Sequence, residues 1–184
     1  NVQSIRIERL KSIASEYSPE AVFNELLLVC GRKETKDPML KFINAPARLE
    51  FLTAVALVQN FEGVDVCPNY AVDDEGLPTF TASGGMADIE CHDKLTDDLV
   101  EVTLITSRKQ VNDEMLPISR HLEEARRTNA NTYSIFVAPS LHQDTKRYVS
   151  WVKFNESLDI LAFAIEDFLQ VLSQYSSFDD FVTA

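Results

Sequence analysis

Residues 84–105 read GGMADIECHDKLTDDLVEVTLI and contain two short apolar runs, 86–91 and 99–105. Each run carries an acid near its middle, Asp88 in the first and Glu101 in the second. A carboxylate in a half-buried strand loses hydration that only hydrogen bonds, a counter-charge or a metal ion can replace. Two such acids in neighbouring strands therefore indicate a shared cation.

Side chains alternate along a strand, so Asp88 and Glu90 share one face, and Glu101 and Thr103 share another. If residues 92–98 form a hairpin turn, Asp88 and Glu101 come side by side on adjacent antiparallel strands. Their charges then repel each other unless a cation lies between them. Mg²⁺ is the expected cation, because one or two carboxylates hold it while its other positions remain open to water and phosphate oxygens.

The chain has 184 residues, of which 45% are hydrophobic and 25% are charged, as is usual for a folded globular protein. This length is sufficient for one domain with its own core. We expect a single domain over residues 1–184, with a helical N-terminal part over about 1–60, a central α/β core over about 61–165 and a C-terminal helix over about 166–176.

The net charge of −12 is informative about partners. Proteins that bind a nucleic-acid backbone unaided normally carry a basic surface. On average this chain repels DNA, so an action on nucleic acid would require a local basic patch or a partner. The charge equally fits a protein that never meets DNA.

Three cysteines, Cys30, Cys67 and Cys91, stand apart from one another in the sequence. Their spacing matches neither a zinc site nor a disulfide framework, so a reducing cytoplasm is the expected location. No apolar stretch is long enough to span a bilayer, and the first residues show no signal-peptide pattern. We expect neither a membrane segment nor export.

Apolar spacing and capping residues predict helices in the N-terminal part. Ser18-Pro19 is a typical helix start and Gly31 a typical stop. Glu50 lies near the start of a helix opened by Pro46, where the helix dipole also favours an acid, so its role depends on the other acids. We expect helices over residues 5–14 and 19–30, a polar loop over 31–37, and helices starting at 38 and 46.

Turn residues break the segment 61–81 into short strands. Farther along, we expect a strand over residues 133–137, a helix over 142–153 and a final helix over 166–175. The apolar run 158–165 is either a late strand or the start of the final helix, because periodicity does not assign short apolar runs.

A further helix is expected after Thr106 or Ser107, which are good N-caps, and it runs toward Arg127 with a break near Pro117. Glu114 lies in this segment. The segment is also the most basic part of the chain, and its cations form either a solvated helix face or phosphate contacts beside the acids. These cations are Arg108, Lys109, Arg120, Arg126 and Arg127.

Three motifs within residues 84–124 resemble the catalytic core of PD-(D/E)xK nucleases, in the form found in AlwI-type type IIS restriction and nicking endonucleases. The motifs are Asp88-Ile89-Glu90, Val100-Glu101-Val102-Thr103 and the segment that begins Ser107-Arg108. The resemblance implies a restriction-endonuclease-like α/β fold with a mixed central sheet, helices on both faces and a helical N-terminal part.

The resemblance also implies four catalytic acids. In that family, an acid on an upstream helix and another on a downstream helix accompany the two strand acids. Glu50 and Glu114 match those places, so the implied set is Glu50, Asp88, Glu101 and Glu114, with Mg²⁺ held by Asp88 and Glu101.

One departure from the broader superfamily concerns the position two after Glu101, which is usually lysine and is Thr103 here. Threonine cannot supply a positive charge, so either Glu114 with a second metal or a base such as Lys109 takes over part of the water activation. A degenerate, inactive copy is also consistent with this change. Thr103, Arg108, Lys109 and His121 are candidates for positioning phosphate or water.

Size is a second departure, because AlwI-type enzymes that act alone carry an additional DNA-recognition region. The length and acidity of this chain resemble the small subunit of a heterodimeric type IIS restriction endonuclease. The resemblance implies two partners: double-stranded DNA, and a larger subunit that recognises a non-palindromic site and nicks one strand. The small subunit would cut the other strand.

Two other classes of function remain open at this stage. One is a catalytically inactive, acidic protein-interaction module on the same fold, which would differ in whether Asp88 and Glu101 converge and whether magnesium binds. The other is a phospho-acceptor or small hydrolase with Asp88 as nucleophile. It is the weaker alternative, because it gives the pair of acids no role.

Overall fold

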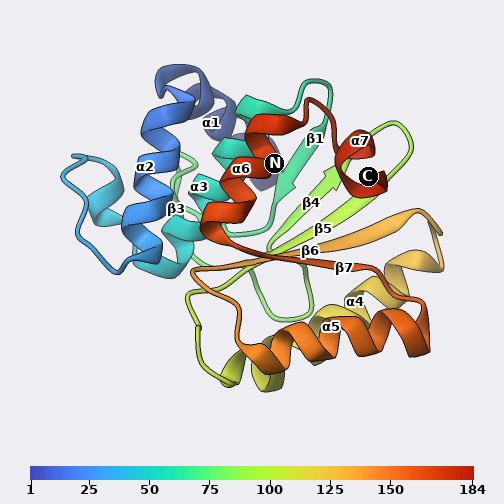
Figure 1. The fold of residues 1–184 in the computed structure, drawn as a ribbon. Coiled ribbons are helices and arrows are strands. Elements are labelled where there is room, and N and C mark those ends of the chain that lie inside the picture. The colour runs from blue at the N-terminus through green and yellow to red at the C-terminus, as the bar shows by residue number, and fades with distance from the viewer.

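A computed structural model describes all residues, 1–184, and its centre is a five-stranded mixed sheet (Figure 1). In spatial order the strands are β1 (Asp65–Pro68), β4 (Ile89–His92), β5 (Asp97–Val102), β6 (Thr132–Ala138) and β7 (Ile160–Ala164). β4 pairs antiparallel with β1 and β5, whereas β5, β6 and β7 are parallel. The strands expected in the runs 86–91, 99–105 and 133–137 correspond to β4, β5 and β6, the middle three of the sheet.

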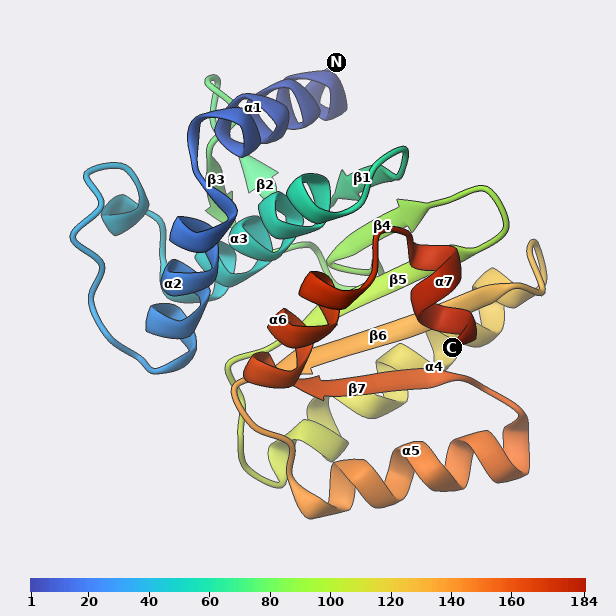
Figure 2. The ribbon, with the colours of Figure 1, turned by 45° about the horizontal axis from the view of Figure 1, so that its top comes forward.

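Helices cover both faces of this sheet, as expected (Figure 2). One face carries α1 (Val2–Glu16), α2 (Pro19–Cys30), α3 (Ala45–Asn60) and α6 (Ile165–Gln174), and the other carries α4 (Leu116–Arg126) and α5 (Gln143–Glu156). A large hydrophobic cluster that includes Phe51 and Phe168 lies on the first side, and a smaller one that includes Met115 and Phe136 lies on the second. None of the helices is both long and apolar enough to cross a membrane.

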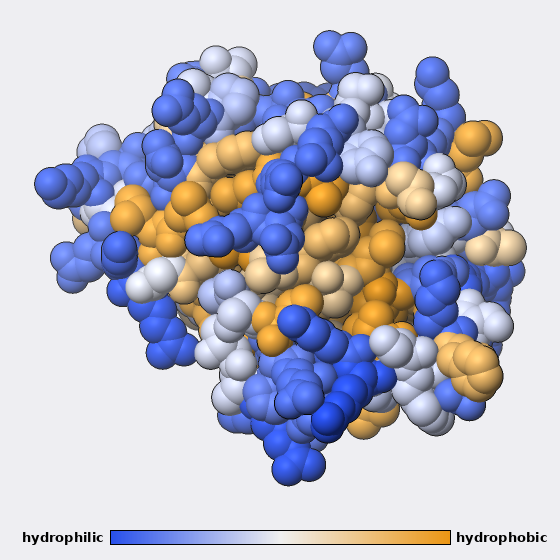
Figure 3. Space-filling view, viewed as in Figure 1, coloured by the Kyte–Doolittle hydropathy of each residue, from blue (hydrophilic) through white to orange (hydrophobic).

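The sheet ends at β7, whose residues after Ile160 are only partly buried. Figure 3 shows hydrophobic side chains gathered around α6 and β7, with hydrophilic residues around the rim of this face. The run 158–165 was expected to be either a late strand or the start of the final helix. It contains both, because β7 ends at Ala164 and α6 begins at Ile165. Parallel pairing of β6 with β7 requires a crossover connection, which α5 provides.

Capping explains where the N-terminal helices start. The Ser18 hydroxyl accepts a hydrogen bond from the Ala21 N–H at 3.1 Å, and Pro19 occupies the first turn of α2. Asn44 caps α3 in the same way through the Ala47 N–H at 3.2 Å. The starts predicted for both helices are correct to within one residue.

The helix predicted from residue 38 is wrong, since only a single 3-10 turn, Leu40–Phe42, forms there. The Asp37 carboxylate accepts hydrogen bonds from the N–H groups of Met39 and Leu40 at 2.9 and 2.8 Å and so starts the turn. Asn44 begins the next helix too soon afterwards for the turn to be extended. The result is an extended connection between α2 and α3.

The hairpin between β4 and β5 has the predicted antiparallel pairing but different bounds. Its turn is tighter than expected and comprises residues 93–96, closed by the Asp93 N–H donating to the Thr96 carbonyl at 3.0 Å. β4 begins only at Ile89, because a turn at Gly84-Gly85, with Gly85 at φ 91°, occupies the residues before it. Asp88 therefore lies just before the strand and not in its middle.

The segment after β5 also differs from the prediction. It is not broken at Pro117: residues Gln110–Met115 form a π-helical segment that continues directly into α4. Pro117 lies in the first turn of α4, where its missing N–H costs little. The short helix α7 (Phe178–Thr183), beyond the predicted C-terminal helix, was not predicted at all.

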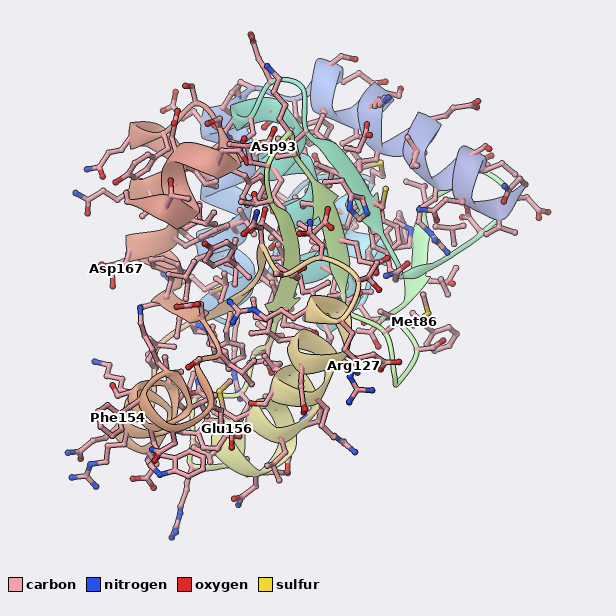
Figure 4. The ribbon with its side chains drawn as sticks, turned by 90° about the vertical axis from the view of Figure 1, so that its right-hand side faces the viewer. Met86, Asp93, Arg127, Phe154, Glu156 and Asp167 are labelled. Carbon is pink, nitrogen blue, oxygen red and sulfur yellow. The ribbon has the colours of Figure 1, made fainter.

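Helix α7 is attached to the tip of the β4–β5 hairpin, where Figure 4 labels Asp93. The Asp93 carboxylate accepts hydrogen bonds from the N–H groups of Phe178 and Asp179 at 3.1 and 3.3 Å. In return, Asp179 accepts a hydrogen bond from the Thr96 hydroxyl at 3.0 Å. The two acids thus link the hairpin tip and the C-terminal helix reciprocally.

Asp98 is fully buried beneath this junction. Its Oδ2 lies 3.1 Å from the Thr96 hydroxyl oxygen, which can accept a proton from protonated Asp98 while it donates its own to Asp179, whereas Oδ1 of Asp98 has no hydrogen-bond partner. Burial raises the pKa of Asp98 to about 7, and the nearby charges of Asp93, Asp97 and Asp179 act in the same direction. The folded protein therefore favours the protonated form of Asp98.

We expect Asp98→Asn to stabilise the protein at pH 8 by about 1–3 kcal/mol and to stabilise it less at pH 5. The pKa of Asp98 is higher in the folded state than in the unfolded state, so stability falls as pH rises from about 4 through 7, and asparagine mimics the protonated acid. Urea unfolding at the two pH values measures the difference. Equal destabilisation at both pH values would contradict this account.

Asp97→Asn is the matched control, at the neighbouring position. Although burial acts in the opposite direction, hydrogen bonds from His92 and Asn129 hold the pKa of Asp97 below its usual value. Its ionised form is therefore the favoured one in the folded state, and the substitution should not stabilise the protein at pH 8.

Candidate active site

The structure brings the four acids implied by the sequence to one region from four different elements. Glu50 belongs to α3, Asp88 precedes β4, Glu101 lies in β5, and Glu114 lies in the π-helical segment before α4. Three of them, Glu50, Asp88 and Glu114, line a cavity of about 330 Å³. The pairing of Ile89 with Val100 places Asp88 opposite Glu101 when the register is continued by one residue.

Asp88 lies at the centre of this group. Its Oδ2 accepts a hydrogen bond from the Val102 N–H at 2.8 Å, which fixes it against the end of β5. Burial raises the pKa of Asp88 well above its usual value, and the charges of Glu101, Glu50 and Glu114 raise it further. All three of the other acids therefore act on this one carboxyl.

Glu50 is only 3% exposed, and its Oε2 accepts a hydrogen bond from the Ala82 N–H at 3.0 Å. Burial raises the pKa of Glu50 to about 7, although that hydrogen bond and another with Asp88 act in the opposite direction. Glu50 lies beyond the first turn of α3, where the helix dipole has little effect. The helix dipole therefore does not account for the burial of Glu50 next to other acids.

Glu101 is paired with His121, which comes from α4 on the other face of the sheet. The Nδ1 atom of His121 lies 3.2 Å from Oε1 of Glu101, and both side chains are largely buried. The hydrogen bond with Glu101 raises the pKa of His121. At neutral pH this histidine therefore holds a proton more readily than a free imidazole and can offset part of the negative charge.

Thr103, the residue at the usual lysine position, points at the same acids. Its side chain is hydrogen-bonded to the Glu114 carboxyl, and its hydroxyl accepts from the Ile105 N–H at 3.2 Å. Burial raises the pKa of Glu114, with a further contribution from the charge of Glu101. Threonine therefore contributes a hydrogen-bond donor where lysine would contribute a charge.

Two other predicted site residues, Arg108 and Lys109, point elsewhere. The Arg108 Nε lies 3.3 Å from Oδ2 of Asp144, and the Lys109 Nζ lies 3.5 Å from Oδ2 of Asp113, with both basic side chains mostly exposed. Throughout the chain, no lysine or arginine nitrogen lies within 4 Å of any of the four acids. The prediction that Lys109 replaces the usual lysine therefore has no support in this geometry.

The four acids suit a hard cation, since the side-chain atoms that they offer as metal ligands are all carboxylate oxygens. However, no group of three or more histidine, cysteine, aspartate or glutamate side chains is already arranged to hold a metal ion. Asp88 and Glu101 are the pair that a cation would bridge, and two carboxylates suffice for Mg²⁺ when water and phosphate complete the shell.

Sequence reasoning missed the main-chain groups that fix these acids. The N–H groups of Val102 and Ala82 hold Asp88 and Glu50, and the short segment around Ala82 also forms part of the cavity wall. Main-chain N–H groups are present in almost every residue, so no residue type in the sequence reveals which of them bind a carboxylate. The paired glycines before Asp88 were the one available sign of an unusual chain path at this place.

Comparisons with known proteins agree with this architecture. The family model of the AlwI restriction endonuclease matches residues 2–171. The small subunit (R.BspD6I2) of the heterodimeric restriction endonuclease R.BspD6I has a similar structure, with a TM-score of 0.67, 24% sequence identity, and coverage of 82% of this chain and 77% of that chain. No curated protein matches in sequence.

Restriction endonuclease FokI is similar in structure over 93% of this chain, with a TM-score of 0.61 and 11% identity. The match covers 32% of FokI, so this chain corresponds to about a third of that enzyme. The expected restriction-endonuclease-like fold is thereby confirmed. From the match of the family model over residues 2–171, the chain belongs to the AlwI restriction endonuclease family.

Proposed function

We propose that this chain is a Mg²⁺-dependent endonuclease subunit that cuts one strand of duplex DNA. The observation that carries the proposal is the convergence of four acids, without a lysine or arginine between them, on the fold of a restriction endonuclease family. Such a cluster is unfavourable in an isolated protein because like charges repel and burial penalises each charge. A bound cation would remove both costs.

In this proposal Asp88 and Glu101 hold Mg²⁺, and Glu50 and Glu114 complete a second site or orient water. When bound, the ion stabilises negative charge on the scissile phosphate and makes a nearby water more acidic. His121 fixes the Glu101 carboxylate by its hydrogen bond, because the hydrogen-bond partners of metal-binding side chains commonly orient them. The protein thus supplies both the ligands and their orientation.

Water activation is the step in which this chain differs from the lysine-containing pattern. Thr103 hydrogen-bonds Glu114 and orients its carboxyl toward the cavity that Asp88 also lines. The raised pKa of Glu114 makes it a better proton acceptor near neutral pH than an ordinary glutamate. We assign the proton of the attacking water to Glu114. The water oxygen forms a new bond to phosphorus, the P–O bond opposite it breaks, and the leaving sugar oxygen takes a proton from solvent water.

We further propose that the chain is the smaller subunit of a heterodimeric type IIS restriction endonuclease. Its net charge of −12 and its structural similarity to R.BspD6I2, over 77% of that chain, support this assignment. The larger subunit would recognise a non-palindromic site in double-stranded DNA and nick one strand, and this chain would cut the other. The larger subunit would also supply the DNA affinity that an acidic chain lacks.

A catalytically inactive, acidic interaction module is the second candidate. The observations that favour it are the absence of a pre-arranged three-ligand metal group and the threonine at position 103. The phospho-acceptor alternative has less support, because Asp88 precedes an antiparallel strand and does not follow the carboxyl end of a parallel one. Metal binding and cleavage distinguish the first two candidates.

Glu101→Ala should reduce cleavage of the DNA strand by about 10³-fold or more, because it removes a metal ligand and the partner of His121. The same loss is expected for Asp88→Ala. Cleavage of a labelled duplex in the presence of the larger subunit measures the effect, and circular dichroism checks that the variant is folded. If either variant cuts at the normal rate, the assignment of these acids is incorrect.

Mg²⁺ should raise the melting temperature of the chain, and it should do so more at pH 8 than at pH 6. Because burial raises the pKa of Glu50 to about 7, protons compete with the ion at the lower pH. Differential scanning fluorimetry with and without Mg²⁺ measures the shift.

The Glu101→Ala variant tests this effect of Mg²⁺ on the melting temperature, both with and without the ion. It should lose the Mg²⁺-dependent shift, and its metal-free form should melt at a higher temperature because Asp88 loses a like-charged neighbour. Asp98→Asn removes an acid near the hairpin tip and should retain the shift. A melting temperature that does not respond to Mg²⁺ at either pH would favour the inactive module.

Dependence on a partner can be tested by strand-resolved cleavage. The chain is incubated with a doubly labelled duplex alone, with a nuclease-inactive larger subunit, or with an active one. We expect the second strand to be cut only when the larger subunit is present, because the chain alone has 17 basic against 29 acidic residues for DNA binding. Efficient site-specific cleavage by the chain alone would exclude a partner-dependent mechanism.

A further inference from the structure

A second cavity, of about 630 Å³, adjoins the acidic one. It lies between the end of α2, the connection that follows it and the start of α3, and this connection extends away from the sheet in Figure 2. Leu104, which directly follows Thr103, lines both cavities. The two cavities therefore share part of a wall.

The second cavity has the opposite charge. Four cations, Arg32, Lys33, Lys41 and Arg48, line it together with a single acid, Glu34. None of the four forms an ion pair within 4 Å. In a chain with a net charge of −12, an unpaired cluster of this kind is a local exception.

Arg48 distinguishes this cluster from a solvated basic surface. It is only 9% exposed, and its Nε is buried without a hydrogen-bond partner. Its Nη1 donates to the Leu40 carbonyl at 3.3 Å, which is long for such a bond. A guanidinium group on a cavity wall with too few hydrogen-bond partners is suited to binding an anionic oxygen ligand. Its planar arrangement of N–H donors matches the oxygens of a phosphate.

We infer that this basic cavity binds a backbone phosphate of the DNA strand that is cut, a few nucleotides from the scissile phosphate. The inference rests on the proposed nuclease function. A DNA strand carries one phosphate per about 3.4 Å of helix axis, so a strand that leaves the acidic cavity past Leu104 brings another of its phosphates to the basic cavity. The contact fixes the register of the strand relative to the four acids.

This placement also explains how an acidic chain tolerates DNA near four carboxylates. The basic cavity offsets the local repulsion next to the site, while the chain as a whole remains too acidic to bind duplex DNA tightly. The basic residues of α4 and its preceding segment are poorer candidates, because Arg108, Lys109 and Arg127 face acids of their own.

The test is the salt dependence of binding to a short duplex, measured by fluorescence anisotropy in metal-free buffer from low to moderate salt. Lys33 and Lys41 are exposed, so Lys33→Gln with Lys41→Gln should fold normally. The slope of log K against log salt should decrease by about 2, and affinity near 0.1 M salt should fall at least tenfold.

The matched control is Lys146→Gln with Lys153→Gln, which removes the same charge from exposed positions of α5 on the other side of the sheet. It should change the slope by less than half as much. Equal effects of the two double variants, or no measurable binding by the wild-type chain at low salt, would overturn the inference.

A parallel titration with inorganic phosphate separates the two sources of the ligand. If phosphate binds the wild-type chain and the Lys33/Lys41 variant leaves the DNA slope unchanged, the cavity is a free-anion site and the inference is incorrect. Because binding is measured without metal, the result is independent of cleavage. A chain that binds through this cavity but never cuts would overturn the nuclease proposal alone.

Discussion

The pairing of β4 with β5 is the constraint on which the site depends, because it places Asp88 opposite Glu101 and leaves the Val102 N–H free to hold Asp88. Everything else at the site is arranged around two carboxylates that repel each other. Glu50 and Glu114 approach from helical segments on either side, and each is held by a hydrogen-bond donor, the Ala82 N–H and Thr103 respectively. Burial and the charges of the neighbouring acids raise the pKa values of Glu50, Asp88 and Glu114.

Much of this arrangement can be predicted from the sequence, where the signal is local. Alternation along two short apolar runs identifies the hairpin and its two acids, and Ser18-Pro19 identifies the start of α2. Strand bounds are less predictable, because the glycine turn before Asp88 and the main-chain bond to Val102 decide where β4 begins. The capping of α7 by Asp93 joins residues far apart in the chain, and no local pattern reports such a contact.

The position of the basic cavity likewise cannot be predicted from local sequence patterns. The basic segment that begins at Arg108 stands out in the sequence, yet Arg108 faces Asp144 of α5, and Lys109 faces Asp113 one turn farther along its own segment. The four cations that line the basic cavity are spread over the end of α2, the loop after it and α3, and they come together only in three dimensions. Arg48, like Glu50, is a charged residue inside a largely apolar helix, but that signal does not reveal which cavity the residue lines.

The shared wall at Leu104 has an electrostatic consequence. An apolar side chain between an acidic and a basic cavity keeps water out of the space that it fills, so the field between the two cavities is screened less there than across open solvent. The potential therefore changes sign over the width of a few side chains. An anionic chain lying across this wall has a preferred position along its own length, because sliding in one direction moves a phosphate toward the carboxylates and sliding in the other moves it toward the cations.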